Sequence, residues 1–372
     1  MTSTDPLPPL WPDSDPSVLA PVAEHEDLRA VVRGVLTKHA DAEQVRAAAE
    51  SGAGPTEVWR LLTSELDLVA IAVPEDRGGA GFGVRELVVV LEETGAALVV
   101  DPVLSSAVLG TRALVLAPAD VSGGLLEAAL TGEALLTVSL QSPGGLVLGS
   151  DGTVDGDLSR VLHGEHATHV VASAAGPDGP VLVAVDIRGA EVRPVQQVDP
   201  TRRLVDIGLA AAPATVLVDH RGHADAFGQL ASLTALAVAA EHTGMVDRLL
   251  DMTVEYVGTR QQFGRPVGSF QAIKHRLADV LVARERCRSA VRYAAASYDL
   301  DPRAAAPAAE VAAVVAADAV VTTAHEAIQL HGGIGFTWEH PAHLYLRRAL
   351  GDEGQFGGAR DHRSRLAELL AL

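Results

Sequence analysis

The sequence predicts an α+β multidomain fold in the order helical domain, β domain, helical bundle. Three observations predict it. Apolar residues recur at helical spacing from residue 21 to 131, short β-rich runs follow from 132 to 222, and long helical patterns occupy residues 223–372. With 372 residues the chain is long enough for two or three domains.

The N-terminal 20 residues carry Pro6, Pro8, Pro9, Pro12 and Pro16 among mostly polar residues, which indicates an unstructured arm. Helical patterns then continue to residue 131, with one interruption. The turn-rich segment Val73-Pro-Glu-Asp-Arg-Gly-Gly-Ala-Gly-Phe-Gly cannot continue a helix and separates two of them. We therefore expect the region 21–131 to be entirely helical.

The middle region changes to β-type sequence. We expect strands at four runs rich in β-branched and apolar residues, namely Leu135–Leu140, His169–Ala172, Val181–Ile187 and Ala214–Val218. Beyond them three long helices are expected at Ala226–Arg260, Phe270–Tyr298 and Pro307–Gly332, where a first-turn proline and a terminal glycine mark the last one. Such helices pack as an antiparallel bundle, and the outer faces of bundles commonly form subunit interfaces.

Composition excludes several classes of function. The formal net charge is −19 and the only lysines are Lys38 and Lys274, so nucleic acid and anionic membranes are poor partners. Cys287 is the only cysteine, which excludes a disulfide framework and a cysteine-built zinc site. The chain does not open on a signal-peptide pattern, and no run reaches the ~18 apolar residues that a membrane span needs. We expect a soluble cytoplasmic protein.

Two motifs in the bundle region suggest a bound ligand. Arg260 and Phe263 are three residues apart, which predicts a cation and a ring on one helix face, suited to a pyrophosphate and a heterocycle. The alternative is a charged residue next to a core phenylalanine. The second motif is Gln329-Leu-His-Gly-Gly-Ile-Gly-Phe-Thr, whose glycines would let the backbone approach an anion closely. The alternative is that this motif is only a helix cap and a turn. A Gly-x-Gly-x-x-Gly after a strand is absent, so a doubly wound dinucleotide fold is not supported.

These motifs together resemble the acyl-CoA dehydrogenases, and the resemblance covers nearly the whole chain. It includes the Val73–Gly83 turn and Asp199-Pro-Thr-Arg-Arg, and it is strongest in Arg260-Gln-Gln-Phe-Gly-Arg-Pro-Val-Gly-Ser-Phe-Gln and in Gln329-Leu-His-Gly-Gly-Ile-Gly-Phe-Thr-Trp-Glu-His. The family fold is an N-terminal helical domain, a middle β domain and a C-terminal four-helix bundle. The resemblance therefore implies the order that the patterns predict.

The resemblance also implies FAD as cofactor, bound between the β domain and the bundle, with its adenine half held by a neighbouring subunit. Five residues match the family pattern for that half: Arg260, Gln262, Phe263, Gln329 and Gly333. A fixed cation and exposed amides suit a pyrophosphate, and a glycine keeps side chains out of its way. The family's usual electron acceptor is an electron-transfer flavoprotein.

In the family a glutamate removes the α proton of an acyl-CoA thioester while flavin N5 takes the β hydride. The two usual positions of this base correspond to Phe356 and Thr234, and neither residue can accept a proton. Glu241 lies seven residues after Thr234, two helical turns or about 10 Å away, and could be a displaced base or a structural residue. Asp352 and Glu353 are expected to be solvated loop charges.

The segments that cover the flavin ring in the family match poorly. This chain has Val138-Ser-Leu-Gln-Ser-Pro-Gly-Gly and Val161-Leu-His-Gly-Glu-His-Ala-Thr-His in their place. The histidines at 163, 166 and 169 could suggest a metal, but no carboxylate spacing supports one and a polar loop is expected.

The residues that would bind a neighbouring subunit's flavin match the family pattern. The residues that would form this chain's own active site do not match it. This resembles the base-deficient subunit of heteromeric acyl-CoA dehydrogenases, in which a homologous partner supplies the glutamate in an α2β2 tetramer. The alternatives are a self-sufficient or homo-oligomeric dehydrogenase with Glu241 or another base, a flavin monooxygenase on the same fold, and a non-enzymatic acyl-CoA-binding scaffold.

Overall fold

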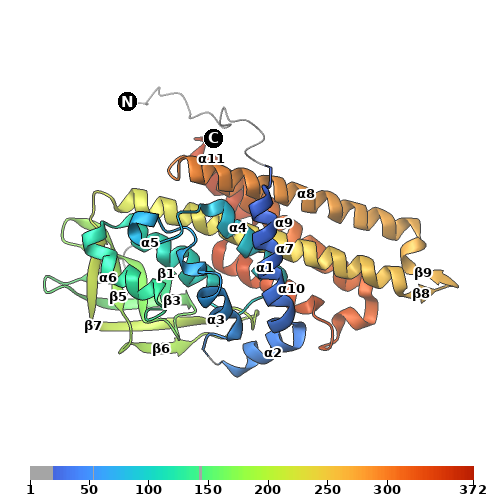
Figure 1. The fold of residues 1–372 in the computed structure, drawn as a ribbon, viewed down its shortest axis with the longest axis horizontal. Helices are drawn as coiled ribbons and strands as arrows, with labels where there is room; N and C mark the ends of the chain where they lie inside the picture. The colour runs from blue at the N-terminus through green and yellow to red at the C-terminus, as the bar shows by residue number, and fades with distance from the viewer. Residues whose placement is uncertain (1–19, 53, 142–144) are drawn as a thin grey trace.

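A computed structural model describes residues 20–52, 54–141 and 145–372, and Figure 1 shows its arrangement. The expected arm lies, apart from Ala20, outside the described residues. The N-terminal part is helical, as expected, and the Val73–Gly83 break lies between its helices. Its elements are α1 (Ala23–His39), α2 (Ala42–Ser51), α3 (Glu57–Ser64), η2 (Leu68–Ala70), η3 (Glu75–Arg77), α4 (Val84–Ala96), the π-helical η4 (Val103–Gly110), α5 (Thr111–Leu116) and α6 (Ala119–Leu130).

The middle part is a sheet that closes on itself. Its strands are β1 (Leu136–Ser139), β2 (Leu146–Leu148), β3 (Thr153–Leu162), β4 (His169–Gly176), β5 (Gly179–Asp186), β6 (Glu191–Pro194) and β7 (Leu204–Val218). The order is β1-β4-β2-β3-β7-β5, and β4 also pairs with β5, which completes a ring. All four expected strands are confirmed, but β2, β3 and β6 were not predicted. Asp155, Gly156 and Asp157 interrupt the alternation in β3, which hides its buried residues Val154 and Leu158.

The C-terminal part is a helical bundle. It contains α7 (His223–Thr259), α8 (Gln271–Leu300), α9 (Ala306–His331), α10 (Ala342–Phe356) and α11 (Ala359–Leu369), with the short η5 (Val267–Ser269) and η6 (Gly332–Phe336). Helix α9 packs against α7, α8, α10 and α11. With η6 it is the one segment of the described chain that is long and apolar enough to cross a membrane by length and composition, and half of its most apolar window is buried inside the fold. The predicted fold class is confirmed.

Helices α4 and α7 cross at very close range, and two glycines permit it. A Cβ on Gly244 would lie 1.7 Å from the backbone oxygen of Glu92, and a Cβ on Gly95 would lie 2.2 Å from that of Glu241. Because backbone atoms cannot yield as flexible side chains do, no larger residue fits at this crossing. The contact fixes α7, which carries most of the residues discussed below, against the N-terminal domain.

One local prediction is wrong. Arg260 and Phe263 do not share a helix face, because α7 ends at Thr259 and the chain continues into a hairpin of β8 (Gln261–Gln262) and β9 (Arg265–Pro266). The two turn residues, Phe263 and Gly264, have φ of +51° and +76°. Positive φ at both central residues is the geometry of a two-residue type I′ hairpin turn, for which X-Gly is a typical sequence.

Candidate functional site

The hairpin carries three of the five predicted flavin contacts at the free end of the bundle. Arg260 caps α7 in an extended conformation and, like Gln262, is exposed. Phe263 is 92% exposed, and its ring meets that of Phe270 edge-on at 6.1 Å between centroids. A phenylalanine with positive φ is strained, and a ring this exposed gains little from its own chain. The hairpin therefore presents an aromatic ring and a cation outward.

The glycine motif lies at the same end. Gln329 is exposed near the end of α9, and Gly332 caps the helix with φ +61°. His331 stacks on Tyr256 of α7 at 4.5 Å, which places the motif beside the last turn of the helix that leads to the hairpin. A Cβ on Gly333 would meet no atom of this chain within 4 Å. We call the five residues Arg260, Gln262, Phe263, Gln329 and Gly333 the clamp.

The two residues that correspond to the usual positions of the catalytic base lie far from the clamp and line one cavity. This cavity has a volume of about 480 Å³, and we call it the inner cavity. Phe356 and Thr234 both line it. The hydroxyl of Thr234 donates to Leu230 O at 2.8 Å, and the guanidinium of Arg202 lies 5.6 Å from the Phe356 ring centroid. Thr234 and Arg260 are 26 positions apart on α7, which is about 39 Å along a helix. Figure 1 shows the hairpin at the end of the molecule away from the sheet.

Glu241 belongs to a buried charge network and does not line the inner cavity. Its carboxylate accepts from Arg202 at 2.5 Å, and Arg202 also donates to Asp352 at 2.5 Å. His242 lies 3.1 Å from the same aspartate. Burial alone would raise the pKa of Asp352, but the charge of Arg202 and the hydrogen bond from His242 lower that pKa well below its usual value. A catalytic Glu241 would have to leave Arg202, so this arrangement does not favour the role considered for it.

Asp352 was expected to be a solvated loop charge, and this prediction is wrong. Asp352 lies in α10 and is 1% exposed, because Arg202 from the Asp199-Pro-Thr-Arg-Arg motif reaches into the bundle and binds it. Glu353, the next residue, is exposed, also in α10. Sequence patterns miss the pair because its partners are 150 residues apart.

Sequence reasoning also missed an ionisable pair in the wall of the inner cavity. Glu310 at the start of α9 and His362 in α11 both line it, with Glu310 Oε2 2.7 Å from His362 Nδ1. Arg365 completes the group at 3.5 Å from the same oxygen. The two residues are 52 positions apart and belong to no motif, so only the packing of α11 on α9 reveals them.

The three histidines considered for a metal have separate partners. His163 pairs with Ser105 at 2.9 Å, His166 with Glu165 at 3.1 Å and His169 with Thr168 at 2.9 Å. Across the described part of the chain, no three potential ligands gather as a metal site would require. His163 is buried rather than in a polar loop, and burial with the charges of Arg202 and Arg348 lowers its pKa to about 3.

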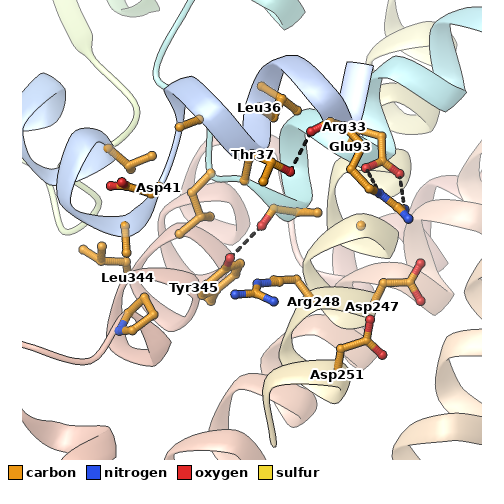
Figure 2. A pocket seen from close by; sticks show the side chains of 18 of the residues that line it. Arg33, Leu36, Thr37, Asp41, Glu93, Asp247, Arg248, Asp251, Leu344 and Tyr345 are labelled. Carbon is orange, nitrogen blue, oxygen red and sulfur yellow. Dashed lines mark hydrogen bonds and ion pairs between the residues drawn. The ribbon is translucent and has the colours of Figure 1, made fainter. Parts of the chain in front are cut away.

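A separate cavity of about 460 Å³ lies between the N-terminal helices and the bundle. Figure 2 shows Arg33 bonded to Glu93 on one wall and Arg248 beside Tyr345 on another. Arg33 pairs with Glu93 within the wall, whereas Asp247 pairs with Arg288, which does not line the cavity. Neither the clamp nor the two base positions line it. We assign it no ligand.

Comparison with known proteins decides the family. The family model described as acyl-CoA dehydrogenase, C-terminal domain, matches residues 221–369, and the one described as acyl-CoA dehydrogenase, N-terminal domain, matches residues 22–119. The acyl-CoA dehydrogenase IpdE2 of Mycobacterium tuberculosis is 38% identical over 334 residues, which cover 90% of this chain and 93% of that protein. The chain belongs to the acyl-CoA dehydrogenase family. Members of this family are FAD-dependent oxidoreductases that dehydrogenate acyl-CoA.

Solved acyl-CoA dehydrogenases share the fold closely. The ChsE4-ChsE5 complex from Mycobacterium tuberculosis is 29% identical with a TM-score of 0.86, covering 95% of this chain and 98% of that one. The Tcur3481-Tcur3483 steroid acyl-CoA dehydrogenase is 30% identical with a TM-score of 0.82, covering 94% and 98%. Butyryl-CoA dehydrogenase from Megasphaera elsdenii, at 20% identity and a TM-score of 0.84 over 95% and 99%, shows the fold alone.

The family implies FAD, and the residues present fit one half of it. The clamp offers an exposed cation, an exposed ring and open space above Gly333, which suit the diphosphate and adenosine of a flavin approaching from outside the chain. The wall of the inner cavity fits the chemistry less well, since an apolar and a hydroxyl side chain occupy the two base positions.

Proposed function

We propose that this chain is the subunit of a heteromeric acyl-CoA dehydrogenase that completes the FAD site of a homologous catalytic partner, in an α2β2 tetramer. Bound FAD accepts the β hydride of the acyl thioester in this chemistry. This chain's clamp residues bind and orient the diphosphate and adenosine, and the partner supplies the carboxylate that removes the α proton.

The observation that carries the proposal is that the chain has an exposed clamp while its own cavity has no base at either usual position. All five clamp residues are exposed, and Arg260 lies about 39 Å along α7 from Thr234. A clamp so placed serves a flavin that another chain holds. Because Phe356 and Thr234 occupy the two usual positions of the base, this chain's own cavity has no base at either of them.

Exposed apolar side chains around the clamp support an interface there. Phe336, in η6, is 85% exposed, and Trp338, which follows η6, is 70% exposed. Exposed large apolar side chains close to one another are typical of a surface that a partner covers. The solved ChsE4-ChsE5 complex and Tcur3481-Tcur3483 enzyme, each named for two different components, are compatible with a homologous partner.

In this proposal the complex works in the cytoplasm and passes electrons to an electron-transfer flavoprotein, the usual acceptor in the family. The only cysteine, Cys287, is free and buried, which accords with a reducing compartment.

The clamp predicts a specific pattern of flavin loss. Arg260→Gln in the co-expressed complex should weaken FAD binding about ten- to a hundredfold, because charge-assisted hydrogen bonds contribute about 1.5–3 kcal/mol. Gly333→Val should also lose flavin while leaving the melting temperature of the lone chain unchanged, because its new side chain meets open space within this chain. FAD content by absorbance and the melting temperature are the measurements.

Arg188→Gln and Gly189→Val are matched controls on the β domain, where Arg188 is exposed and Gly189 also has nothing within 4 Å. Both should retain flavin. Full flavin content in Arg260→Gln and Gly333→Val complexes would contradict the clamp assignment.

Glu310 is the observation that favours a self-sufficient dehydrogenase instead, since it places a carboxylate on the same cavity as Phe356. Its pairing with His362 and Arg365 favours a structural role. Glu310→Gln should therefore leave the rate of the complex unchanged, and a loss of rate at full flavin content would make Glu310 the base.

A further inference from the structure

Three aromatic rings hold the loop that follows α9 against α7. His331, the last residue of α9, stacks on Tyr256 of α7 with 4.5 Å between ring centroids. The ring of His340 lies 4.3 Å from that of His331 by the same measure. His331 and His340 therefore flank residues 332–339, which we call the glycine loop. We call Tyr256, His331 and His340 together the ring stack.

The glycine loop carries groups that the proposed complex uses. Gly333 belongs to the clamp, and the large side chains of Phe336 and Trp338 are exposed. Arg46 on α2 donates to the backbone oxygens of Trp338 and Glu339, so a cation that never titrates also holds the loop. Contact of the loop with α7, the helix that leads to the hairpin, depends on the ring stack.

Hydrogen bonds fix the positions of the protons on the two imidazoles. His331 Nδ1 lies 2.7 Å from Ala327 O, which only accepts, so Nδ1 carries a proton. The Nε2 atom of His331 is buried and has no hydrogen-bond partner among the described residues. His340 Nδ1 accepts from Ala342 N–H at 3.3 Å, so the proton of this ring is on Nε2. Both imidazoles are neutral in this arrangement.

The site resists a positive charge on either ring. His331 is 3% exposed, and a proton on its Nε2 would create a buried cation without an acceptor for that N–H. Burial lowers the pKa of His331. Burial and the neighbouring His331 and His343 lower the pKa of His340 to about 4. The closed loop therefore favours neutral histidines.

The charged neighbours of the ring stack do not offset this effect. His343 of α10 has a pKa lowered by burial and by two cations, Arg347 of α10 and Arg46 of α2. Tyr256 of α7 presents a neutral phenol ring. The carboxylate within the glycine loop, that of Glu339, belongs to an exposed residue. Positive charge on the stack would thus meet further positive charge.

We propose that the ring stack is an acid-sensitive switch that positions the glycine loop, and with it Gly333, for the flavin of the partner subunit. Neutral His331 and His340 stack and keep the loop closed on α7. Protonation of either ring favours an open loop, in which the imidazolium reaches water. The effect on flavin rests on the proposed function, whereas the opening is a property of this chain alone.

The pH dependence follows from the different proton affinities of the two loop states. His340 in an open loop has an ordinary pKa of about 6.5, whereas in the closed loop its pKa is about 4. Between these values the open loop binds the additional proton, so closure is complete above pH 6.5 and is lost as the pH falls. From this histidine alone, the ratio of open to closed loop should be about thirtyfold larger at pH 5 than at pH 8.

The first test is amide hydrogen exchange of the purified full chain at pH 8 and pH 5, corrected for intrinsic exchange rates and read by mass spectrometry. Protection of the glycine loop should fall by up to about thirtyfold. Residues 235–246 of α7, which are buried and report global unfolding, should stay far more protected. Equal protection of the loop at the two pH values would overturn the proposal.

Two variants distinguish a titrating ring from a merely structural one. His340→Phe keeps a ring in the stack that cannot be protonated, so the fall in protection should be much smaller. His340→Ala removes the ring and should leave the loop open at both pH values. His220→Phe, at an exposed histidine before α7, should behave as the unaltered chain. An equal fall in His340→Phe and the unaltered chain, or a closed loop in His340→Ala, would contradict the switch.

The second test measures the FAD affinity of the co-expressed complex at pH 8 and pH 5 by flavin fluorescence. The affinity should be lower at pH 5, and His340→Phe should remove most of the difference. A complex that holds flavin equally well at both pH values would overturn the positioning role. A complex without flavin at pH 8 would contradict the proposed function instead, and hydrogen exchange of the lone chain would still decide whether the ring stack opens with acid.

Discussion

Two buried arginine side chains, those of Arg202 and Arg348, join the β domain to the bundle. Arg202 reaches Asp352 and Glu241, and Arg348, which is fully buried, binds Asp199 at 2.8 Å. Burying such charges is unfavourable unless each has a partner, so the loss of one member leaves the others uncompensated.

Arg202→Met should therefore destabilise the chain by about 3–5 kcal/mol, because Glu241 and Asp352 would remain buried without a cation. Denaturant unfolding monitored by circular dichroism measures the change. Arg188→Met removes an exposed arginine bound to Asp186 and should change stability little. If both variants unfolded at the same denaturant concentration, the network would not be stabilising.

His163 predicts a pH dependence of stability. Its pKa falls to about 3 in the folded chain, so between pH 6.5 and 3 the unfolded chain binds the additional proton and stability is lost as the pH decreases. The contribution is up to about 1.4 kcal/mol per pH unit. His163→Gln, which does not titrate, should show a shallower fall in unfolding free energy between pH 7 and pH 5. An unchanged slope would mean that His163 is accessible to protons in the folded state.

The close crossing of helices α4 and α7 predicts that a larger residue at the contact destabilises the chain. Gly244→Ala should destabilise the chain by about 3 kcal/mol, since the added methyl would lie 1.7 Å from a backbone oxygen of α4. Gly228→Ala, on the same helix with nothing within 4 Å, should be neutral or stabilising by about 0.5–1 kcal/mol. Thermal unfolding of the two variants compares them directly, and similar melting temperatures would show that the helices can separate without penalty.

Sequence patterns predict elements well where the pattern is local. The three long bundle helices begin and end within about three residues of their expected limits, because proline, glycine and helical periodicity mark them. The patterns fail where geometry depends on partners far along the chain. The three-residue spacing of Arg260 and Phe263 predicts a shared helix face, whereas the chain turns at Phe263. The roles of Asp352 and Glu310 depend on Arg202 and His362, which no local pattern connects to them.

The whole molecule keeps the clamp that serves a neighbouring subunit's flavin and lacks a base at the two usual positions in its own cavity. Its clamp is exposed at the free end of the bundle, and its own cavity, beside the sheet, has phenylalanine and threonine at the base positions. The central claim is that the clamp closes on a flavin whose chemistry belongs to another chain.

The most direct test is the visible spectrum and acyl-CoA dehydrogenase activity of the chain purified alone and after co-expression with a homologous acyl-CoA dehydrogenase encoded beside it. The account predicts a colourless, inactive lone chain and a yellow, active complex. A lone chain that is yellow and active would contradict it and favour a self-sufficient dehydrogenase, whereas a lone chain that is yellow and uses oxygen would favour a monooxygenase. A complex that never binds flavin would leave only a scaffold role.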